Sequence, residues 1–391
     1  MAEATVNQLP LLLLLLLLAA LLVVPAGAAP AIDGVPVFPG DHIWNARVDT
    51  LPVDPDSALY VSTIGEARTV HADFGSGLWD GGPIGIPFVS VPGTQPKVPV
   101  AFEYGDESDP GPYPIPPDAP IEWGSDHHIL VLDRDHRLLY EVYAAERLAD
   151  GSWRTGSGAI FDLASYALRP DGYTSADAAG LPILPGLVRY DEVAAGEISH
   201  AIRFTAPQTR HACVWPARHY ASSLTDVRFP PMGQRFRLRA DFNTSSFSPE
   251  VQVVLRALKE YGMVLADNGS SWYLSGAPDS RWNNDRLAEL GRVPGSAFEA
   301  VDVSSLMDDP DSGRVRPGIV TVPGGVGPPT DMNVDGLYDD VNGNGRTDFA
   351  DVVLFFNQIS WIAANEPVAA FDCNANGRID FADVVRLFDR I

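Results

Sequence analysis

Two stretches near the end of this 391-residue chain repeat one spacing of polar residues. Oxygen-bearing side chains stand at loop positions 1, 3, 5, 9 and 12, with glycine at position 6. The first copy holds Asp340, Asn342, Asn344, Gly345, Asp348 and Asp351, and the second holds Asp372, Asn374, Asn376, Gly377, Asp380 and Asp383. Alternate oxygen ligands on a tight turn converge on one point, as a calcium ion requires, and position 7 supplies a backbone carbonyl, here that of Arg346 or Arg378. The spacing therefore predicts two Ca²⁺ sites.

An apolar stripe follows each loop. It comprises Phe349, Val352, Val353, Phe356 and Ile359 after the first loop, and Phe381, Val384, Val385, Phe388 and Ile391 after the second. This spacing is typical of one face of an amphipathic helix. Since a unit of roughly 20 residues has too little core of its own, we expect the two helices to bury their stripes against each other.

A partial third copy precedes these loops. Asp331, Asn333, Asp335 and Gly336 match its first half, but its twelfth position would be Asn342, which the next loop already uses. We interpret this segment as a turn, with a third metal site as the alternative.

The duplicated loop and helix resembles a type I dockerin module, in the style of those that end secreted archaeal proteins. The resemblance covers residues 331–391. It implies a small all-α unit that folds on calcium and docks to a cohesin-type module of another protein, most often in assemblies that degrade polysaccharide. Dockerins of well-studied cohesins usually carry a hydroxyl pair at loop positions 10 and 11, whereas this chain has Phe349-Ala350 and Phe381-Ala382.

The other end of the chain predicts export. An apolar run at 11–24 is too short to span a bilayer comfortably, and the small residues Ala26-Gly27-Ala28 after it suit signal peptidase. We expect a signal peptide at 1–28 and a secreted or cell-surface protein without stable membrane insertion. The run has no Lys or Arg before it, so a retained anchor is the alternative.

Composition limits the partners. The chain has 51 acidic and 27 basic residues, a net charge of −24, which argues against nucleic acid because phosphates would be repelled. Its two cysteines, Cys213 and Cys373, lie in different predicted modules, so no disulfide framework is expected.

Residues 33–309 form a predicted body, joined to the final module by a Pro/Gly linker at 310–330. Short β-rich runs dominate the body, and 126–143 is typical of a hairpin turned at Arg134-Asp135. The clearest helix is 248–262, with Ser248 at its start and Gly262 at its end. The prediction is a mainly β body, a β-sandwich of jelly-roll type with a few short helices.

The densest polar segment of the body is 169–205. Our candidate catalytic residues there are Asp177, Glu192, His200 and Arg203. Two carboxylates at one cleft would serve glycosidic hydrolysis, whereas a His or Tyr base with an Arg that neutralises a uronate would serve a lyase. The alternative, which we favour for any one residue taken singly, is that Asp177 caps a turn and that Asp191-Glu192 face solvent.

Histidines and aromatic residues give two further groups. Histidines and carboxylates that could hold a metal or move protons are His71 with Asp73, Asp126-His127-His128, His200, and His211 with His219. Adjacent strand residues point to opposite faces, so at most one of His127 and His128 can face a given cleft, and no HxH or HExxH spacing is present. Trp272 and Trp282, with Arg281, stand among polar neighbours and are our candidates for sugar binding at the surface.

These observations favour a secreted enzyme that acts on polysaccharide, a glycoside hydrolase or a lyase, carried by a calcium-folded dockerin. The enzyme class is inferred from the association of dockerin modules with enzymes that degrade polysaccharide, and not from residues of the body. The alternative is a non-catalytic carbohydrate-binding or cell-surface scaffold protein. A secreted peptidase or inhibitor is a third alternative, but we find no nucleophile motif that supports it.

Overall fold

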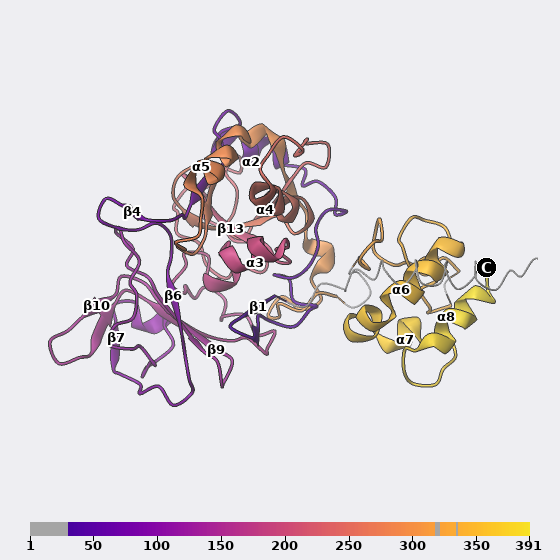
Figure 1. The fold of residues 1–391 in the computed structure, drawn as a ribbon, viewed down its shortest axis with the longest axis horizontal. Coiled ribbons are helices and arrows are strands. Elements are labelled where there is room, and N and C mark those ends of the chain that lie inside the picture. Colours follow the sequence, from indigo (N-terminus) through magenta and orange to yellow (C-terminus); the bar gives the residue numbers. More distant parts are fainter. Residues whose placement is uncertain (1–29, 317–320, 334) are drawn as a thin grey trace, which may run out of the picture. The chain divides into compact units, whose positions relative to one another are not determined.

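The computed structural model describes residues 30–316, 321–333 and 335–391, which divide into two compact units, a body up to 316 and a C-terminal unit from 321 (Figure 1). The expected signal peptide at 1–28 lies outside the described residues, as does part of the expected linker. Within the described ranges, no helix has both the length and the apolar character needed to cross a membrane.

The largest sheet of the body has six strands in the order β17-β14-β15-β13-β16-β3. Their bounds are β17 Phe298–Val301, β14 Arg235–Leu238, β15 Met263–Asn268, β13 Ile202–Ala206, β16 Tyr273–Ser275 and β3 His71–Asp73. Two pairings in this sheet, β13 with β15 and β16 with β3, are parallel. β3 forms one edge of the sheet.

Smaller sheets complete the β structure. A four-stranded sheet orders β12 Gly158–Asp162, β9 Leu138–Val142, β8 Ile129–Asp133 and β6 Phe88–Val91, and a three-stranded sheet orders β10 Glu146–Arg147, β11 Trp153–Thr155 and β7 Val100–Phe102. Two-stranded ribbons pair β1 Ala31–Ile32 with β2 Val35–Pro36, and β4 Leu78–Trp79 with β5 Gly82–Pro83. The predicted hairpin is confirmed, because β8 and β9 pair antiparallel on either side of Arg134-Asp135.

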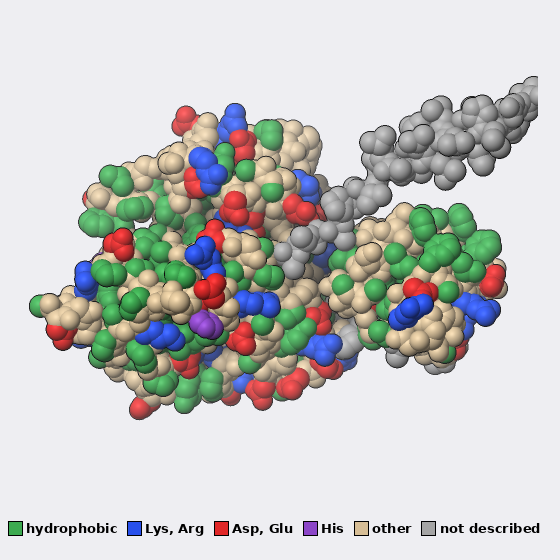
Figure 2. All heavy atoms as spheres, turned by 60° about the horizontal axis from the view of Figure 1, so that its bottom comes forward, with side chains coloured by type: hydrophobic (Ala, Val, Ile, Leu, Met, Phe, Trp, Pro, Cys, Tyr) green, Lys and Arg blue, Asp and Glu red, His purple; other side chains and the backbone are tan. Residues whose placement is uncertain are grey.

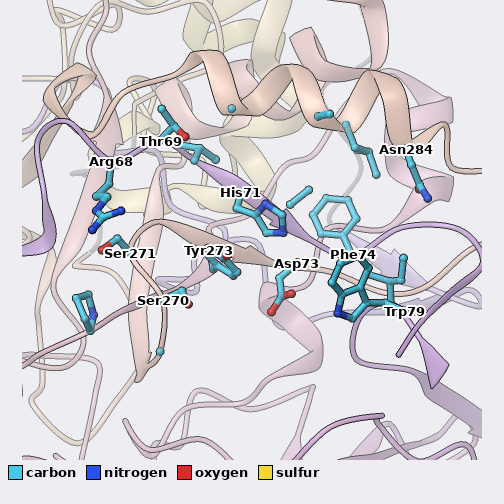
Figure 3. Close-up of a pocket in the computed structure, with 18 residues that line it drawn as sticks. Arg68, Thr69, His71, Asp73, Phe74, Trp79, Ser270, Ser271, Tyr273 and Asn284 are labelled. Atoms are coloured by element: carbon cyan, nitrogen blue, oxygen red, sulfur yellow. The ribbon is translucent and has the colours of Figure 1, made fainter. Parts of the chain in front are cut away.

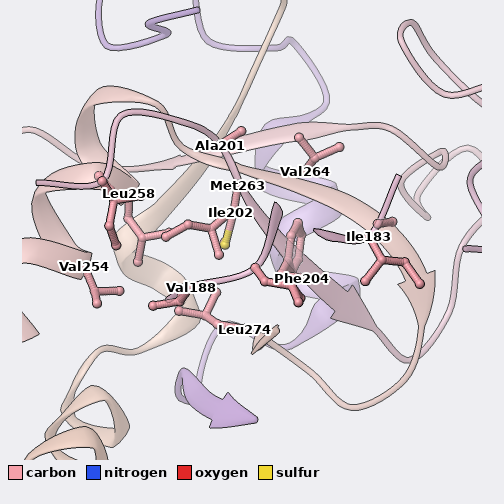
Figure 4. Close-up of a cluster of buried hydrophobic side chains, with 14 of the residues drawn as sticks. Ile183, Val188, Ala201, Ile202, Phe204, Val254, Leu258, Met263, Val264 and Leu274 are labelled. Carbon is pink, nitrogen blue, oxygen red and sulfur yellow. The ribbon is translucent and has the colours of Figure 1, made fainter. Parts of the chain in front are cut away.

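The helices of the body are short. They are α2 Ser57–Ile64, α3 Tyr190–Ala195, α4 Pro249–Glu260 and α5 Asn284–Leu287, with 3₁₀ turns at Gly105–Glu107, Leu184–Gly186, Ala288–Arg292, Gly295–Ala297 and Ser304–Leu306. The predicted helix 248–262 is confirmed as α4. Its stripe is fully buried, and Figure 4 shows Val254 and Leu258 beside Ile202 of β13 and Met263 of β15. Ser248 precedes the helix, but its side chain makes no capping hydrogen bond.

The body is thus mainly β with a few short helices, as predicted. A jelly roll is built from antiparallel pairs, whereas four pairings here are parallel, the two in the large sheet together with β6–β8 and β7–β11. The predicted jelly-roll type therefore does not describe these sheets. In the large sheet, the parallel pairs join segments that lie far apart in the sequence.

One face of the six-stranded sheet is polar at its β3 end. In the registers Thr205↔Tyr273 and Tyr273↔His71, strands β13, β16 and β3 align these three side chains in one row. Asp267 joins that row opposite Thr205, because a bulge between Phe204 and Thr205 shifts the register of β15 by one residue. Bulges often re-aim a side chain in this way.

The C-terminal unit is built from α6 Phe349–Asn365, α7 Val368–Phe371 and α8 Phe381–Phe388. Its core includes Val341, Phe355, Phe371 and Leu387. α6 and α8 begin in the same way, with Asp348 or Asp380 at the N-cap and reciprocal bonds to the aspartate three residues later. Such a capping box satisfies backbone donors that the first turn leaves without partners.

Candidate functional site

The two expected calcium loops have the same backbone geometry. The Asp340 carboxylate accepts hydrogen bonds from the backbone N–H groups of Asn344 at 3.0 Å and Gly345 at 2.8 Å. In the second loop Asp372 accepts from Asn376 at 2.9 Å and Gly377 at 2.7 Å. Each loop therefore wraps around its first aspartate, which brings the alternate oxygen ligands onto one side.

The twelfth residue closes each loop. Asp351, fully buried, accepts from the backbone N–H groups of Asn342 at 2.9 Å and Asp348 at 2.8 Å. Asp383 does the same with Asn374 at 3.1 Å and Asp380 at 2.7 Å. The remaining expected ligands, Asn344, Arg346, Asn376 and Arg378, occupy the same two turns.

The electrostatics of the first loop fit a cation. Burial raises the pKa of Asp351; backbone N–H groups of Asp348 and Asn342 oppose this rise, and the charges of Asp340 and Asp348 add to it. Carboxylates gathered at one point repel each other, and a hard divalent ion with oxygen ligands would neutralise them. The donor set of both loops thus fits Ca²⁺.

The partial third copy folds as a turn of similar form. Asp331 accepts from the backbone of Asp335 at 3.2 Å and of Gly336 at 2.7 Å. The Asp335 carboxylate forms an ion pair with Arg390 at 3.2 Å. The turn is as expected, and whether it holds a metal stays a prediction.

The apolar stripes of α6 and α8 are only partly buried, which corrects the expectation that they cover each other. Val352 and Val384 lie in the core. Four phenylalanines remain more than half exposed, namely Phe349, Phe356, Phe381 and Phe388. They contact each other in two pairs across the helices, Phe349 with Phe388 at 6.1 Å and Phe356 with Phe381 at 5.8 Å between ring centroids. We call these four residues the phenylalanine face.

In the body, Asp177 and Arg203 lie in one buried network. Arg203 donates to Asp177 through Nε at 2.8 Å, to Ser275 at 2.7 Å and to Asp267 at 3.1 Å. Burial raises the pKa of Asp177, although the Arg203 charge opposes this rise. Burial likewise raises the pKa of Asp267 to about 6, against the opposing charge of Arg203.

Glu192 and His200 belong to a separate network. Glu192 lies 3.1 Å from Nε2 of His200 and 2.8 Å from the Arg189 guanidinium. Burial would raise the pKa of Glu192, but the His200 and Arg189 charges outweigh it and hold the pKa below its usual value. The four candidate catalytic residues are therefore buried in two ion-pair networks and do not line one cleft, so their geometry assigns them structural work.

The expected surface position of the two tryptophans is wrong. Trp272 is fully buried, donates through its indole N–H to the Gly65 carbonyl at 2.9 Å, and stacks on Phe204. Trp282 is buried too and donates to the Ala277 carbonyl at 3.0 Å. Neither ring offers a face to a sugar. Arg281 is exposed, but it pairs with Asp279 at 2.5 Å.

Two carboxylates and a histidine lie close together in the body, and the sequence had indicated two of these three residues, Asp126 and His128. Glu122, Asp126 and His128 place one ligand atom each within 4.8 Å of the others. His128 is buried between a Glu122 carboxylate at Nδ1 and the Ala176 carbonyl, 2.9 Å from Nε2. Burial would lower the pKa of His128, but the Glu122 charge raises it to about 9. The protonated ring thus satisfies both partners without a metal.

An open pocket of about 1110 Å³ runs along the edge strand β3 (Figure 3). His71 and Asp73 of β3 line it together with Tyr273 of β16, and Arg68 and Trp79 stand toward its two ends. The ring centroids of His71 and Tyr273 are 4.3 Å apart. Asp73 is exposed to the open pocket, but the surrounding protein partly desolvates its carboxyl and so raises its pKa; the His71 charge opposes this rise and the Glu122 charge adds to it. The sequence had indicated His71 with Asp73, but neither Arg68 nor Trp79.

The paired loops and helices define a duplicated calcium-loop module at the end of the chain. The family model of the dockerin type I domain matches residues 338–391, which confirms the resemblance seen in the sequence. Dockerin domains in general bind calcium and dock to cohesin modules, and proteins that carry them are typically extracellular or attached to the cell surface. No curated protein and no solved structure matches the chain.

Proposed function

We propose that this protein is exported, that its C-terminal unit folds on two calcium ions and docks to a cohesin-type module, and that its body acts on polysaccharide. The observation that carries the docking part is the phenylalanine face beside two loops of calcium-binding geometry. The proposed action of the body on polysaccharide is supported by the pocket along β3, which combines several polar side chains with the exposed indole of Trp79.

The phenylalanine face is the surface through which we propose docking. Each of its four rings is 53–60% exposed, a large apolar area for a unit of this size. Such patches mark interaction sites, and aromatic side chains dominate binding energy at interfaces. Phe349 and Phe381 occupy loop position 10, so the cohesin partner that we propose recognises aromatic rings where other dockerins present hydroxyls.

An immobilised cohesin module tests docking. It should retain the full chain in calcium and release it when a chelator is added. Phe349→Ser combined with Phe388→Ser should weaken binding by about 30-fold or more, while the number of bound calcium ions stays the same. Val227→Ser, at an exposed body position, is the matched control and should bind as the unchanged chain does. Equal binding of the double variant and the control would remove the face from the proposal.

We place the proposed polysaccharide site of the body at the pocket along β3. Sugar sites combine a flat aromatic face with a few converging polar groups, and the pocket supplies Trp79, whose side chain is 76% exposed, with His71, Asp73 and Tyr273. The alternative remains a non-catalytic carbohydrate-binding or scaffold protein, which would use the same indole without turnover.

A polysaccharide panel separates these two functions. Release of new chain ends by the full protein would support an enzyme, and retention on the polysaccharide without release would favour the scaffold. Trp79→Ala should weaken either behaviour, whereas Trp272→Phe, in the core, should leave polysaccharide affinity unchanged. Absence of both binding and release on every polysaccharide would contradict the proposed action of the body.

A further inference from the structure

Four polar side chains of the β3 pocket make no hydrogen bond or salt bridge in the described part of the chain. They are those of Arg68, His71, Asp73 and Tyr273. Arg68, His71 and Asp73 are exposed and Tyr273 is half-buried. The buried arginines Arg169, Arg203 and Arg218 pair with carboxylates, and the buried Arg235 donates to backbone carbonyls. Polar groups that converge on a pocket without partners point to a ligand.

The mixture of groups discriminates between two ways of cutting a glycosidic bond. Hydrolysis by the common route needs two carboxylates flanking the bond, and Asp73 is the single carboxylate among the described residues that line this pocket. Elimination needs instead a base, an acid and a positive group that neutralises a substrate carboxylate. His71, Tyr273 and Arg68 supply these three.

We propose that the β3 pocket binds a uronate unit of an acidic polysaccharide and cleaves the adjoining glycosidic bond by β-elimination, with His71 as base, Tyr273 as acid and Arg68 holding the uronate carboxylate. This inference rests on the proposed action on polysaccharide and names its substrate class.

The step balances without water or any further reactant. His71 takes the proton at C5 of the uronate, the electron pair of that C–H bond forms the C4=C5 double bond, and the bond from C4 to the glycosidic oxygen breaks. The Tyr273 hydroxyl gives its proton to the leaving oxygen. His71 is then protonated and Tyr273 is an anion. Because the two rings lie 4.3 Å apart as cross-strand neighbours, the proton returns from His71 to Tyr273 and resets the pair.

Charge and position fit these roles. Figure 3 shows Arg68 at one end of the pocket and Trp79 at the other, with His71, Tyr273 and Asp73 between them. Basic and acidic side chains are interspersed over the surface that Figure 2 shows. In a chain of net charge −24, a guanidinium at the pocket without a salt bridge offers an anion a local attraction. Asp73, whose charge interacts with that of His71, stabilises the imidazolium formed in the step.

The experiment uses the full chain in calcium with polygalacturonate and alginate as acidic probes, and with amylose and mannan as neutral probes. The expected result is ultraviolet absorbance from unsaturated uronate, matched by new reducing ends, on at least one acidic probe and on neither neutral one. Tyr273→Phe should lower kcat by about 10²–10⁴-fold with little change in KM, since the ring stays in place. Arg68→Met should raise KM for the acidic probe.

Two control variants and the product analysis make the outcomes decisive. Tyr104→Phe and Arg134→Met change exposed residues elsewhere in the body and should keep full activity. Reducing ends without absorbance would mean hydrolysis, which overturns the inference and leaves the proposed function standing. Binding without either product overturns the inference in favour of the scaffold. Failure to bind or cleave any probe overturns both, and unaltered elimination by Tyr273→Phe removes Tyr273 as the acid.

Discussion

Removal of calcium should unfold the C-terminal unit and leave the body folded. The core of this unit is small, built around residues such as Val341, Phe355 and Phe371, and domains with small cores are marginally stable. In the first loop Asp340 and Asp351 are both fully buried with no arginine or lysine paired to them in the described structure. Without a cation their charges oppose folding, so we expect a bound ion to supply much of the stability of this unit.

The expected size of the effect follows from linkage. An ion that binds the folded state alone adds about 2.7 kcal/mol at a hundredfold excess over Kd, and two loops together add about 5 kcal/mol. This equals the lower end of the stability of a whole domain, about 5 kcal/mol. For a unit of this size each kcal/mol shifts Tm by about 4–8 °C. Chelation should therefore lower the Tm of the C-terminal unit by about 20–40 °C.

Scanning calorimetry of the full chain measures this shift, with the body's transition as an internal control. Asp340→Ala and Asp372→Ala should each remove about half of the calcium-dependent shift and reduce the titrated sites from two to one. Asp331→Ala, in the partial third copy, is the matched control and should keep two sites. A C-terminal transition that ignores the chelator would refute the reasoning, and a loss of a site with Asp331→Ala would show that the third turn binds metal.

Three further predictions concern the body. Trp272→Ala should destabilise it by about 3–5 kcal/mol in urea unfolding because the ring is wholly buried; a loss below about 1 kcal/mol would place the ring at a surface after all. Arg203→Met should cost about 3–5 kcal/mol by leaving Asp177 buried and unpaired, more than Asp177→Asn, and the reverse order would contradict the network. Burial raises the pKa of Glu141 from 4.5 to about 7, so the folded state holds this proton more tightly and stability should fall by about 3 kcal/mol as the pH rises through this interval. Glu141→Gln keeps an acceptor for the Ile183 and Leu184 N–H groups and should abolish that fall, while the exposed control Glu197→Gln should retain it.

The features that the sequence predicted well are local. The oxygen-bearing residues of each loop lie within twelve consecutive residues, so their spacing alone indicated the dockerin type I resemblance that the family model confirms. That they bind Ca²⁺ stays a prediction. The hairpin β8–β9 and the helix α4 are likewise read from neighbours two to four positions apart. The mainly β character of the body follows from many such short runs.

The catalytic candidates show where local reasoning stops. Asp177, Glu192, His200 and Arg203 are dense in one segment, but Arg203 finds Asp267 and Ser275 more than sixty residues away. The buried charge of Arg203 is stabilised by these partners, because an unpaired charge in the core is costly. The many charged residues of segment 169–205 therefore reflect ion pairing. The segment itself does not show which distant strands supply the partners.

The tryptophans failed for a related reason. Polar neighbours around Trp272 and Trp282 indicated a surface, yet both indoles turn inward and find carbonyl acceptors at Gly65 and Ala277. An indole has one donor, which a single carbonyl satisfies. Polar neighbours in the sequence hence say little about an aromatic ring whose partner comes from another segment.

The β3 pocket depends on a pairing between segments about two hundred residues apart, since β3 joins the sheet through Tyr273↔His71. Its signal in the sequence is weak but present: polar residues alternate in His71-Ala72-Asp73 and in Tyr273-Leu274-Ser275, while the residues between them face the core. The same alternation also occurs in Arg203-Phe204-Thr205, where the arginine is paired. What separates a functional group from a structural one is thus not its spacing but whether the folded chain leaves it without a partner. Leaving a polar group without a partner gives the fold no stability, so the unpaired set at the pocket is where a ligand has to be sought.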